Sequence, residues 1–291
     1  MVNKIGFIGT GMMGLPMAKR LINANYKLVV FNRTKSKANE LINLGASWAE
    51  SPTEVANQSE IVISMISNTQ VLEEISHGEN GILNGLSING IHIDMSTVSP
   101  EATYRLYNEY KKQQKHFMHS PVLGSVQNVV EGSLLIFAGG DKNVFEKCKD
   151  VFNTLGKKTY FFEDIKKSGY LKLLSNQFIA TMIISLSQGL LIAENAGIPI
   201  DTVLDVLSES TLNSTMYQIK GKSIKDRNFS PRFMTKHILK DINLIIEASQ
   251  KLKIDLPIMD KVKKLFEEAV ANGFAEEDYS SIYKVLKNDL C

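Results

Sequence analysis

The sequence predicts an α/β protein of two domains, in which a doubly wound, mostly parallel sheet is joined by a long helix to an all-helical C-terminal domain. The chain has 291 residues, and a single hydrophobic core seldom extends much beyond about 250 residues. Short apolar runs alternate with helix-length segments in the first half only, and helical periodicity alone follows. We therefore expect one domain over residues 1–163 and a second over residues 164–291.

Short apolar runs bounded by polar or glycine-containing segments are typical of buried strands. Because helix-length stretches separate most of them, right-handed crossovers would pair the strands in parallel and place helices on both faces of the sheet. The predicted strands are Lys4–Ile8, Lys27–Phe31, Ile61–Met65, Ile91–Met95, Phe117–His119, Leu134–Ala138 and Thr159–Phe162.

The second half is predicted to be helical throughout. Apolar residues recur at spacings of three and four from Leu174 to Ala193, and helices are also expected after Pro199, over Ile238–Leu252 and over Pro257–Ala271. No segment rich in Gly, Pro or Ser separates the halves. We expect the helix that begins near Lys166 to join the two domains rigidly and to leave a cleft between sheet and helices.

Charge and composition exclude several classes of partner. The formal net charge of +2 gives no electrostatic reason to expect a nucleic acid or an acidic membrane surface. Phe178–Ala193, the longest apolar stretch, contains polar residues and is shorter than the ~20 residues of a bilayer span. The sequence therefore predicts a protein without nucleic-acid or membrane partners.

The cysteines and histidines indicate neither a disulfide framework nor a metal site. Cys148 and Cys291 are the only cysteines, and a chain of this size without disulfides suits a reducing cytoplasm. His116 and His119 are the closest pair of histidines, but side chains three apart on a strand point to opposite faces. No metal is expected.

A glycine turn follows the first predicted strand and precedes a predicted helix. Gly9-Thr10-Gly11-Met12-Met13-Gly14 has the G-x-G-x-x-G spacing of a Rossmann-type dinucleotide site. The first glycine permits the tight turn, the second lets the backbone approach a pyrophosphate, and the third lets helix and strand pack closely. Gly9, Gly11, Met12, Met13 and Gly14 are the expected phosphate-binding residues, at the N-terminus of the helix.

The end of the second strand indicates which dinucleotide binds. A site for NAD places a carboxylate about 20 residues beyond the turn, on the ribose 2′-hydroxyl. This chain has Asn32-Arg33-Thr34 there, and no acidic residue until Glu40. Arg33 can bind a 2′-phosphate through its guanidinium, with donors from Asn32 and Thr34. NADP is therefore the predicted cofactor, with NAD as the second choice.

Further candidates follow later strands, where residues beyond the carboxyl ends of parallel strands face the ligand crevice. They are Met65, Ser96, Thr97 and the loop Leu123-Gly124-Ser125. Ser99 and Pro100 are explained as the N-cap and first residue of the next helix. On the long helix, Lys172 and Asn176 lie one turn apart on one face.

Together these segments resemble the β-hydroxyacid dehydrogenase family, which includes 3-hydroxyisobutyrate dehydrogenase and the glyoxylate and succinic semialdehyde reductases. The motifs that carry the resemblance are the glycine turn, Ser96-Thr97, Pro121 to Ser125, Gly169…Lys172…Asn176, and Phe233…Lys240-Asp241. The resemblance implies that Lys172 is the catalytic residue and that Asn176 places it and the substrate. It further implies that Lys240 reaches the cofactor or substrate and that Thr97 lies beside the nicotinamide.

The substrate loop departs from the family pattern. The family usually has acidic-Ala-Pro-Val-Ser-Gly-Gly, whereas His119, Leu123 and Ser125 occupy the acidic, serine and last glycine positions here. The Gly124-Ser125 ending resembles the glyoxylate and succinic semialdehyde reductase branch. Ser96, Leu123, Gly124 and Ser125, with Lys172 and Asn176, are the expected substrate contacts, and backbone N–H groups at Gly124 and Ser125 can hold a carboxylate.

These residues predict an NADP(H)-dependent oxidoreductase acting on a small carboxylate-bearing aldehyde, keto acid or hydroxy acid. We expect Lys172, in an apolar setting that lowers its pKa, to act as general acid and base. Two other readings remain: a non-catalytic dinucleotide-binding or scaffold protein, and a related imine reductase, a class that generally lacks the lysine. The family resemblance and the apolar helical half also predict a homodimer or homotetramer.

Overall fold

The computed structural model describes residues 4–288, which form two compact units divided between Lys172 and Leu173. The sequence placed the domain boundary at 163/164, near the start of the long helix. The helix that joins the units, α9 (Ile165–Asn195), is continuous, and its first two turns pack with the first unit. Cys291 lies outside the described residues.

A single sheet organises the first unit, with nine strands in the described part of the chain. Its order is β3-β2-β1-β4-β5-β6-β8-β7, and β9 pairs with β8. Strands β1 to β6 are parallel, β8 is antiparallel to β6 and β7, and β9 is parallel to β8. The strands are β1 (Lys4–Ile8), β2 (Lys27–Phe31), β3 (Ser47–Trp48), β4 (Ile61–Ser64), β5 (Ile91–Asp94), β6 (His116–His119), β7 (Val122–Leu123), β8 (Leu134–Gly139) and β9 (Gly156–Phe162).

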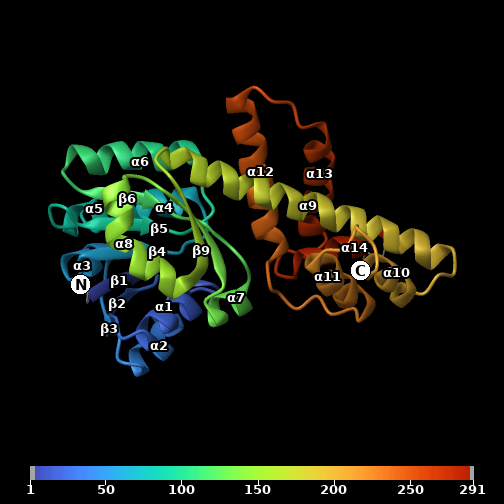
Figure 1. The fold of residues 1–291 in the computed structure, drawn as a ribbon, viewed down its shortest axis with the longest axis horizontal. Helices are drawn as coiled ribbons and strands as arrows, with labels where there is room; N and C mark the ends of the chain where they lie inside the picture. Colours follow the sequence, from blue (N-terminus) through green and yellow to red (C-terminus); the bar gives the residue numbers. More distant parts are fainter. Residues whose placement is uncertain (1–3, 289–291) are drawn as a thin grey trace. The chain divides into compact units, whose positions relative to one another are not determined.

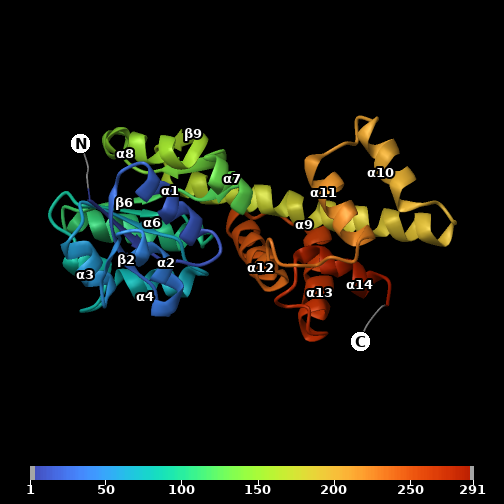
Figure 2. The same ribbon diagram turned by 90° about the horizontal axis from the view of Figure 1, so that it is seen from below.

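Helices cover both faces of this sheet, as the sequence predicts. Alternate residues of β1 divide between two cores: Ile5 and Phe7 join one, and Ile8 joins the other. Figure 2 shows α8 on one side of the sheet and α3 and α4 on the other. The helices of this unit are α1 (Gly14–Asn23), η1 (Lys35–Ala38), α2 (Asn39–Asn43), α3 (Pro52–Asn57), α4 (Thr69–Ser76), α5 (Ile82–Gly85), α6 (Pro100–Lys112), α7 (Val126–Glu131) and α8 (Lys142–Leu155).

The second unit is helical, and its longest element is the part of α9 that follows Lys172 (Figure 1). Leu173, Ala180, Ile183 and Leu190 form a buried row along that helix. By length and composition alone α9 would suffice to cross a membrane, so the length argument from the sequence does not hold for the whole helix. The other helices are α10 (Ile200–Ser208), α11 (Thr215–Lys225), α12 (Thr235–Leu252), α13 (Pro257–Ala271), η2 (Tyr279–Ser281) and α14 (Ile282–Leu286).

The predicted elements are present, with shifts of a few residues at their ends. Ser99 and Pro100 take the predicted positions at the start of α6, although the Ser99 side chain makes no capping hydrogen bond. The sequence missed β3 and β7 because two-residue strands carry no detectable alternation. It missed α11 because lysines and Gly221 interrupt its apolar pattern.

Candidate functional site

The glycine turn between β1 and α1 shows which of its glycines the protein itself requires. Gly9 has a φ of +94°, and a Cβ there would overlap the carbonyl oxygen of Met65. A Cβ on Gly14 would overlap the carbonyl oxygen of Gly9. Gly11, in contrast, has an ordinary negative φ, is exposed, and a Cβ there would meet nothing within 4 Å. The space above Gly11 is therefore open to a ligand that approaches the backbone.

The end of β2 is tied to this turn by a side-chain amide. Asn32 Oδ1 accepts the N–H of Thr10 at 3.0 Å, and Asn32 Nδ2 donates to the carbonyl of Thr34 at 2.8 Å. The amide is thus occupied in shaping the turn, whereas Arg33 and Thr34 are exposed. The open glycine, the helix N-terminus and an exposed guanidinium fit the phosphates of a dinucleotide.

Polar side chains end three neighbouring parallel strands. Ser64, Asp94 and His119 are the last residues of β4, β5 and β6 and are register partners across the sheet. Asp94 is buried and its Oδ1 accepts the hydroxyls of Ser64 at 2.7 Å and Ser96 at 2.8 Å. A buried polar layer therefore lies at the carboxyl edge of the sheet, where ligands of such folds bind.

This layer supports the predicted crevice residues Met65, Ser96 and Thr97. Ser96 is buried, and its hydroxyl also accepts the backbone N–H of Ile66 at 2.8 Å. Met65 donates its backbone N–H to Ile8 at 2.9 Å, which holds the end of β4 beside β1. Thr97 is half-buried. The Ser96 side chain thus fixes the backbone that presents Thr97.

His119 connects the same layer to α9. Its Nε2 lies 3.1 Å from the carbonyl oxygen of Ser96, and its Nδ1 lies 3.1 Å from the hydroxyl of Ser168. Burial lowers the pKa of His119 to about 4, so the ring is neutral at pH 7. Gly169 follows Ser168 on α9, and a Cβ on it would lie 3.3 Å from His119 Cε1 and 3.0 Å from Pro100. The predicted motif glycine at 169 thus permits α9 to pack against β6.

The predicted substrate loop has one glycine that the backbone requires. Gly124 has a φ of +147°, and a Cβ there would lie 2.7 Å from Leu134 and 2.9 Å from Asn128. Ser125 donates its N–H and its hydroxyl to Asn128 Oδ1, at 2.8 and 3.0 Å. The Ser125 backbone N–H is therefore engaged within the loop. Leu123 is half-buried on β7, opposite Leu135.

In the second unit, Asp241 brings Asn176 and Lys240 together. Asn176 Nδ2 donates to Asp241 Oδ2 at 2.5 Å, and Lys240 Nζ lies 2.7 Å from Asp241 Oδ1. Asn176 is 1% exposed and Asp241 is 2% exposed. Because a carboxylate only accepts, Asn176 must direct its amide nitrogen toward Asp241. Its Oδ1 is also buried and has no hydrogen-bond partner within residues 4–288.

Lys172 lies one turn before Asn176 on α9 and is half-buried. It is the last residue of the first unit, whereas Asn176 is fixed in the second. The continuous helix therefore sets the spacing between the two predicted catalytic residues, at about 1.5 Å of rise per residue.

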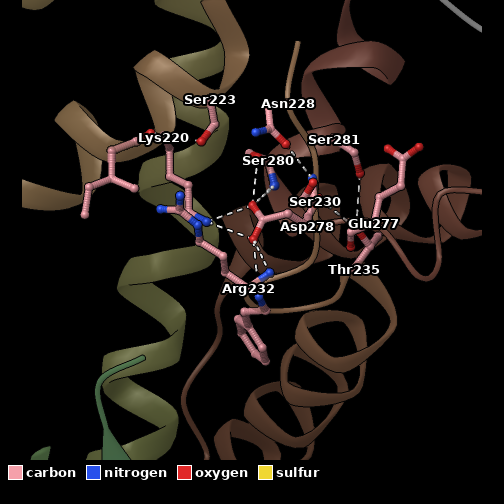
Figure 3. Close-up of polar contacts among 12 residues, drawn as sticks. Lys220, Ser223, Asn228, Ser230, Arg232, Thr235, Glu277, Asp278, Ser280 and Ser281 are labelled. Atoms are coloured by element: carbon pink, nitrogen blue, oxygen red, sulfur yellow. Dashed lines mark hydrogen bonds and ion pairs between the residues drawn. The ribbon is translucent and has the colours of Figure 1, made fainter. Parts of the chain in front are cut away.

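A buried ion pair lies near the start of α12 (Figure 3). Lys220 Nζ lies 2.7 Å from Asp278 Oδ1 and 2.9 Å from Oδ2. Asp278 also accepts backbone N–H groups from Arg232, Phe233 and Ser280. The carboxylate thus holds the segment before α12, which contains Phe233, against the segment after α13.

The structure brings together part of the predicted site within each unit. In the first unit, the turn that contains Gly9 and Gly14 lies beside Met65 and Asn32. Sequence reasoning missed the Asp94, His119 and Ser168 connections, although polar residues ending adjacent strands were a usable signal. Between residues 4 and 288, no three His, Cys, Asp or Glu side chains gather as a metal site would.

Comparison with known families identifies both units. Residues 4–163 match the NAD binding domain of 6-phosphogluconate dehydrogenase, and residues 168–286 match the NAD-binding domain of NADP-dependent 3-hydroxyisobutyrate dehydrogenase. The chain belongs to the β-hydroxyacid dehydrogenase family. The predicted family, its two-part fold and its nicotinamide dinucleotide cofactor are thereby confirmed, and the chain is an NAD(P)-dependent oxidoreductase of the hydroxyacid dehydrogenase type.

Individual relatives match along almost the whole chain. Glyoxylate/succinic semialdehyde reductase 1 of Arabidopsis thaliana is 31% identical over 98% of this chain and 98% of its own length. The cytokine-like nuclear factor N-PAC of Drosophila melanogaster is 27% identical over 96% of this chain, which spans 46% of that protein. A 3-hydroxyisobutyrate dehydrogenase structure from Mycobacterium tuberculosis has a TM-score of 0.89 at 21% identity, covering 99% of this chain and 100% of its own.

Proposed function

We propose that this β-hydroxyacid dehydrogenase transfers a hydride between NADPH and a small carboxylate-bearing aldehyde or keto acid of the glyoxylate or succinic semialdehyde type, or oxidises a 3-hydroxy acid in reverse. The observation that carries the proposal is on α9. Asn176 is buried one turn after Lys172, is held by Asp241, and keeps an unpartnered oxygen. This arrangement suits the handling of a proton beside a carbonyl.

The cofactor would be held by the glycine turn and the end of β2. Backbone N–H groups of Met12 and Met13, at the start of α1, face the diphosphate in this proposal, and Gly11 leaves room for it. Arg33 supports NADP over NAD because its guanidinium is exposed and no carboxylate precedes Glu40. When bound, NADPH supplies the hydride.

Lys172 supplies the proton in the reducing direction. Hydride addition leaves negative charge on the carbonyl oxygen, and a positioned ammonium stabilises that charge and protonates the oxygen as it forms. Asn176 Oδ1 accepts a hydrogen bond from the Lys172 ammonium or from the product hydroxyl. Asp241 prevents the Asn176 amide from turning, because rotation would face two oxygens toward each other. Lys240, paired with Asp241, directs positive charge to the cofactor or to the substrate carboxylate.

The loop between β7 and α7 would determine which acid binds. Leu123 places an apolar side chain at the serine position of the family loop pattern, and the Ser125 N–H donates to Asn128 Oδ1. Gly124 therefore contributes the backbone N–H for a substrate carboxylate in this proposal. A loop with fewer hydroxyl donors favours a small acid held mainly by charge.

We also propose a cytoplasmic homodimer or homotetramer that assembles through the second unit. Large apolar side chains are exposed there on α9, α10 and α13, and such surface usually marks an interaction site. The exposed residues on these helices are Leu174, Phe178, Ile192, Val206 and Ile258. Burial of these residues between copies would account for the apolar composition of α9 without a membrane.

One experiment tests the activity. NADPH and NADH oxidation are followed with glyoxylate, succinic semialdehyde, methylmalonate semialdehyde and tartronate semialdehyde, with wild type and Lys172→Ala. Wild type should turn over at least one acid with preference for NADPH. Lys172→Ala should lose about 10²–10⁴-fold in kcat while binding NADPH normally.

Two results would contradict the proposal. Wild-type turnover in Lys172→Ala would remove the lysine from the chemistry. NADPH binding without turnover of any acid would favour a non-catalytic dinucleotide-binding role. Turnover of cyclic imines instead would favour an imine reductase.

A further inference from the structure

A buried polar chain at the carboxyl edge of the sheet ends on the catalytic helix. It runs from Asp94 through Ser96 to His119, and from His119 to Ser168 on α9. Asp94, Ser96, His119 and Ser168 are each fully buried. None of these side chains reaches solvent, so none is available to bind substrate directly.

The hydrogen-bond donors along this chain have a definite direction. The Ser96 carbonyl only accepts, so the neutral His119 ring carries its proton on Nε2. Nδ1 is then an acceptor, 3.1 Å from the Ser168 hydroxyl. That hydroxyl has a single proton, which is shared between His119 Nδ1 and the Ile165 carbonyl oxygen, 2.7 Å away in the first turn of α9. His119 thus spans the gap between the turn that presents Thr97 and the helix that presents Lys172.

Close packing reinforces this connection. A Cβ on Gly139, the β8 neighbour of His119, would lie 2.8 Å from the Ser168 hydroxyl. A Cβ on Gly169 would press against His119 and Pro100. Two glycines therefore bring the helix close enough for the His119 to Ser168 hydrogen bond, which fixes the rotation of α9 one turn before Lys172.

We propose that His119 is a positioning residue that holds Lys172 in register with the Ser96-Thr97 turn, through its paired hydrogen bonds to Ser96 and Ser168. The inference rests on the proposed role of Lys172. It also assigns a role to the residue by which this chain departs from the acidic residue of its family. A loss of the helix-side bond lets the first turns of α9 rotate, and small displacements of a catalytic group reduce turnover strongly.

The test separates the helix-side bond from general stability. Ser168→Ala removes the hydroxyl on α9, and His119→Gln keeps a donor toward Ser96 while withdrawing the acceptor from Ser168. Each variant should lower kcat about 10- to 100-fold and leave the Kd for NADPH, measured by NADPH fluorescence, within about twofold of wild type. Because both changes break the same hydrogen bond, between His119 and Ser168, kcat of the double variant should fall no further than kcat of the more affected single variant.

Ser187→Ala is the matched control. Ser187 lies on the same helix, is equally buried, and its hydroxyl has no partner in the described chain. Its substitution should leave kcat unchanged. Wild-type kcat in Ser168→Ala, or multiplicative losses in the double variant, would overturn the positioning role. If wild type reduces none of the acids, the proposed function fails first, and that result is distinct from wild-type kcat in Ser168→Ala.

Discussion

The two units each contain a buried polar cluster, and the clusters differ in charge. In the first unit, Asp94, Ser96, His119 and Ser168 form a chain in which the imidazole is neutral. In the second, Lys220 and Asp278 form a compact ion pair, and burial lowers the pKa of Lys220 while Asp278 opposes that shift. The first cluster joins a strand edge to a helix, and the second fixes a connecting segment.

The difference indicates two uses of buried polarity. Removal of one partner of a buried ion pair leaves an uncompensated charge, which costs far more than one neutral hydrogen bond. We therefore expect the second cluster to contribute mainly to stability. In the first cluster the imidazole is neutral and costs less to desolvate than an ammonium, and we expect that cluster to contribute mainly to the placement of α9.

Asp278→Ala should have the largest effect on stability. The substitution leaves the Lys220 ammonium buried and also removes the acceptor for three backbone N–H groups. We expect a loss of about 3–5 kcal/mol in the free energy of unfolding, measured by urea denaturation. Asp201→Ala, which breaks an exposed pair with Lys225, is the control and should change nothing measurable. Equal losses of unfolding free energy in the two variants would show that burial does not determine how much each ion pair contributes to stability.

Acid should destabilise the first unit through its buried histidines. Burial lowers the pKa of His119 to about 4 and that of His92 to about 3, against 6.5 for a free side chain. The unfolded chain therefore binds more protons below pH 6.5, and stability falls as the pH falls from there toward 4. At pH 5 each histidine should cost about 2 kcal/mol relative to pH 7.5.

Urea unfolding at both pH values, with His92→Asn beside wild type, checks this prediction. The variant lacks one of the two titrating groups and should show a pH dependence smaller by about 2 kcal/mol. An unchanged pH dependence in His92→Asn would mean that folding does not lower the pKa of His92.

Tyr110→Phe should have the smallest effect of the three. The Tyr110 hydroxyl lies 2.9 Å from His92 Nδ1, and His92 Nε2 lies 2.8 Å from the Ser64 hydroxyl of the polar layer. Loss of this neutral bond should cost about 1 kcal/mol, measured by urea denaturation, and leave kcat at the wild-type value. A large fall in kcat would show that the whole polar layer, and not only the bond between His119 and Ser168, controls the position of α9.

The sequence predicted those features that depend on local pattern. Strands β1 and β2 have the predicted bounds, as does α13, because alternation, helical periodicity and proline or glycine boundaries are local signals. The glycine turn was predicted with its full context. The Asn32 contact with Thr10 was not, because it depends on how β2 pairs with β1.

Connections between distant segments escaped the sequence for the same reason. His119 and Ser168 are 49 residues apart, and Asn176 and Asp241 are 65 apart. From the sequence, His119 was considered only as a metal ligand, which was excluded, and as a departure from the family loop, since nothing local indicates that its ring faces α9. The Lys220 and Asp278 pair had no motif, and only the packing of α11 against η2 brings the two residues together.

Glycines of one short turn are required for two different reasons: Gly9 and Gly14 by the fold, and Gly11, which has open space above it, by a bound ligand. A mutagenesis screen for soluble expression would reject substitutions of Gly9 and Gly14, because a Cβ there overlaps backbone atoms of the protein. The same screen would accept substitutions of Gly11. A screen for retention on an immobilised nucleotide would discard all three. A position that only the nucleotide screen rejects is one where the bound ligand, and not the fold, requires glycine.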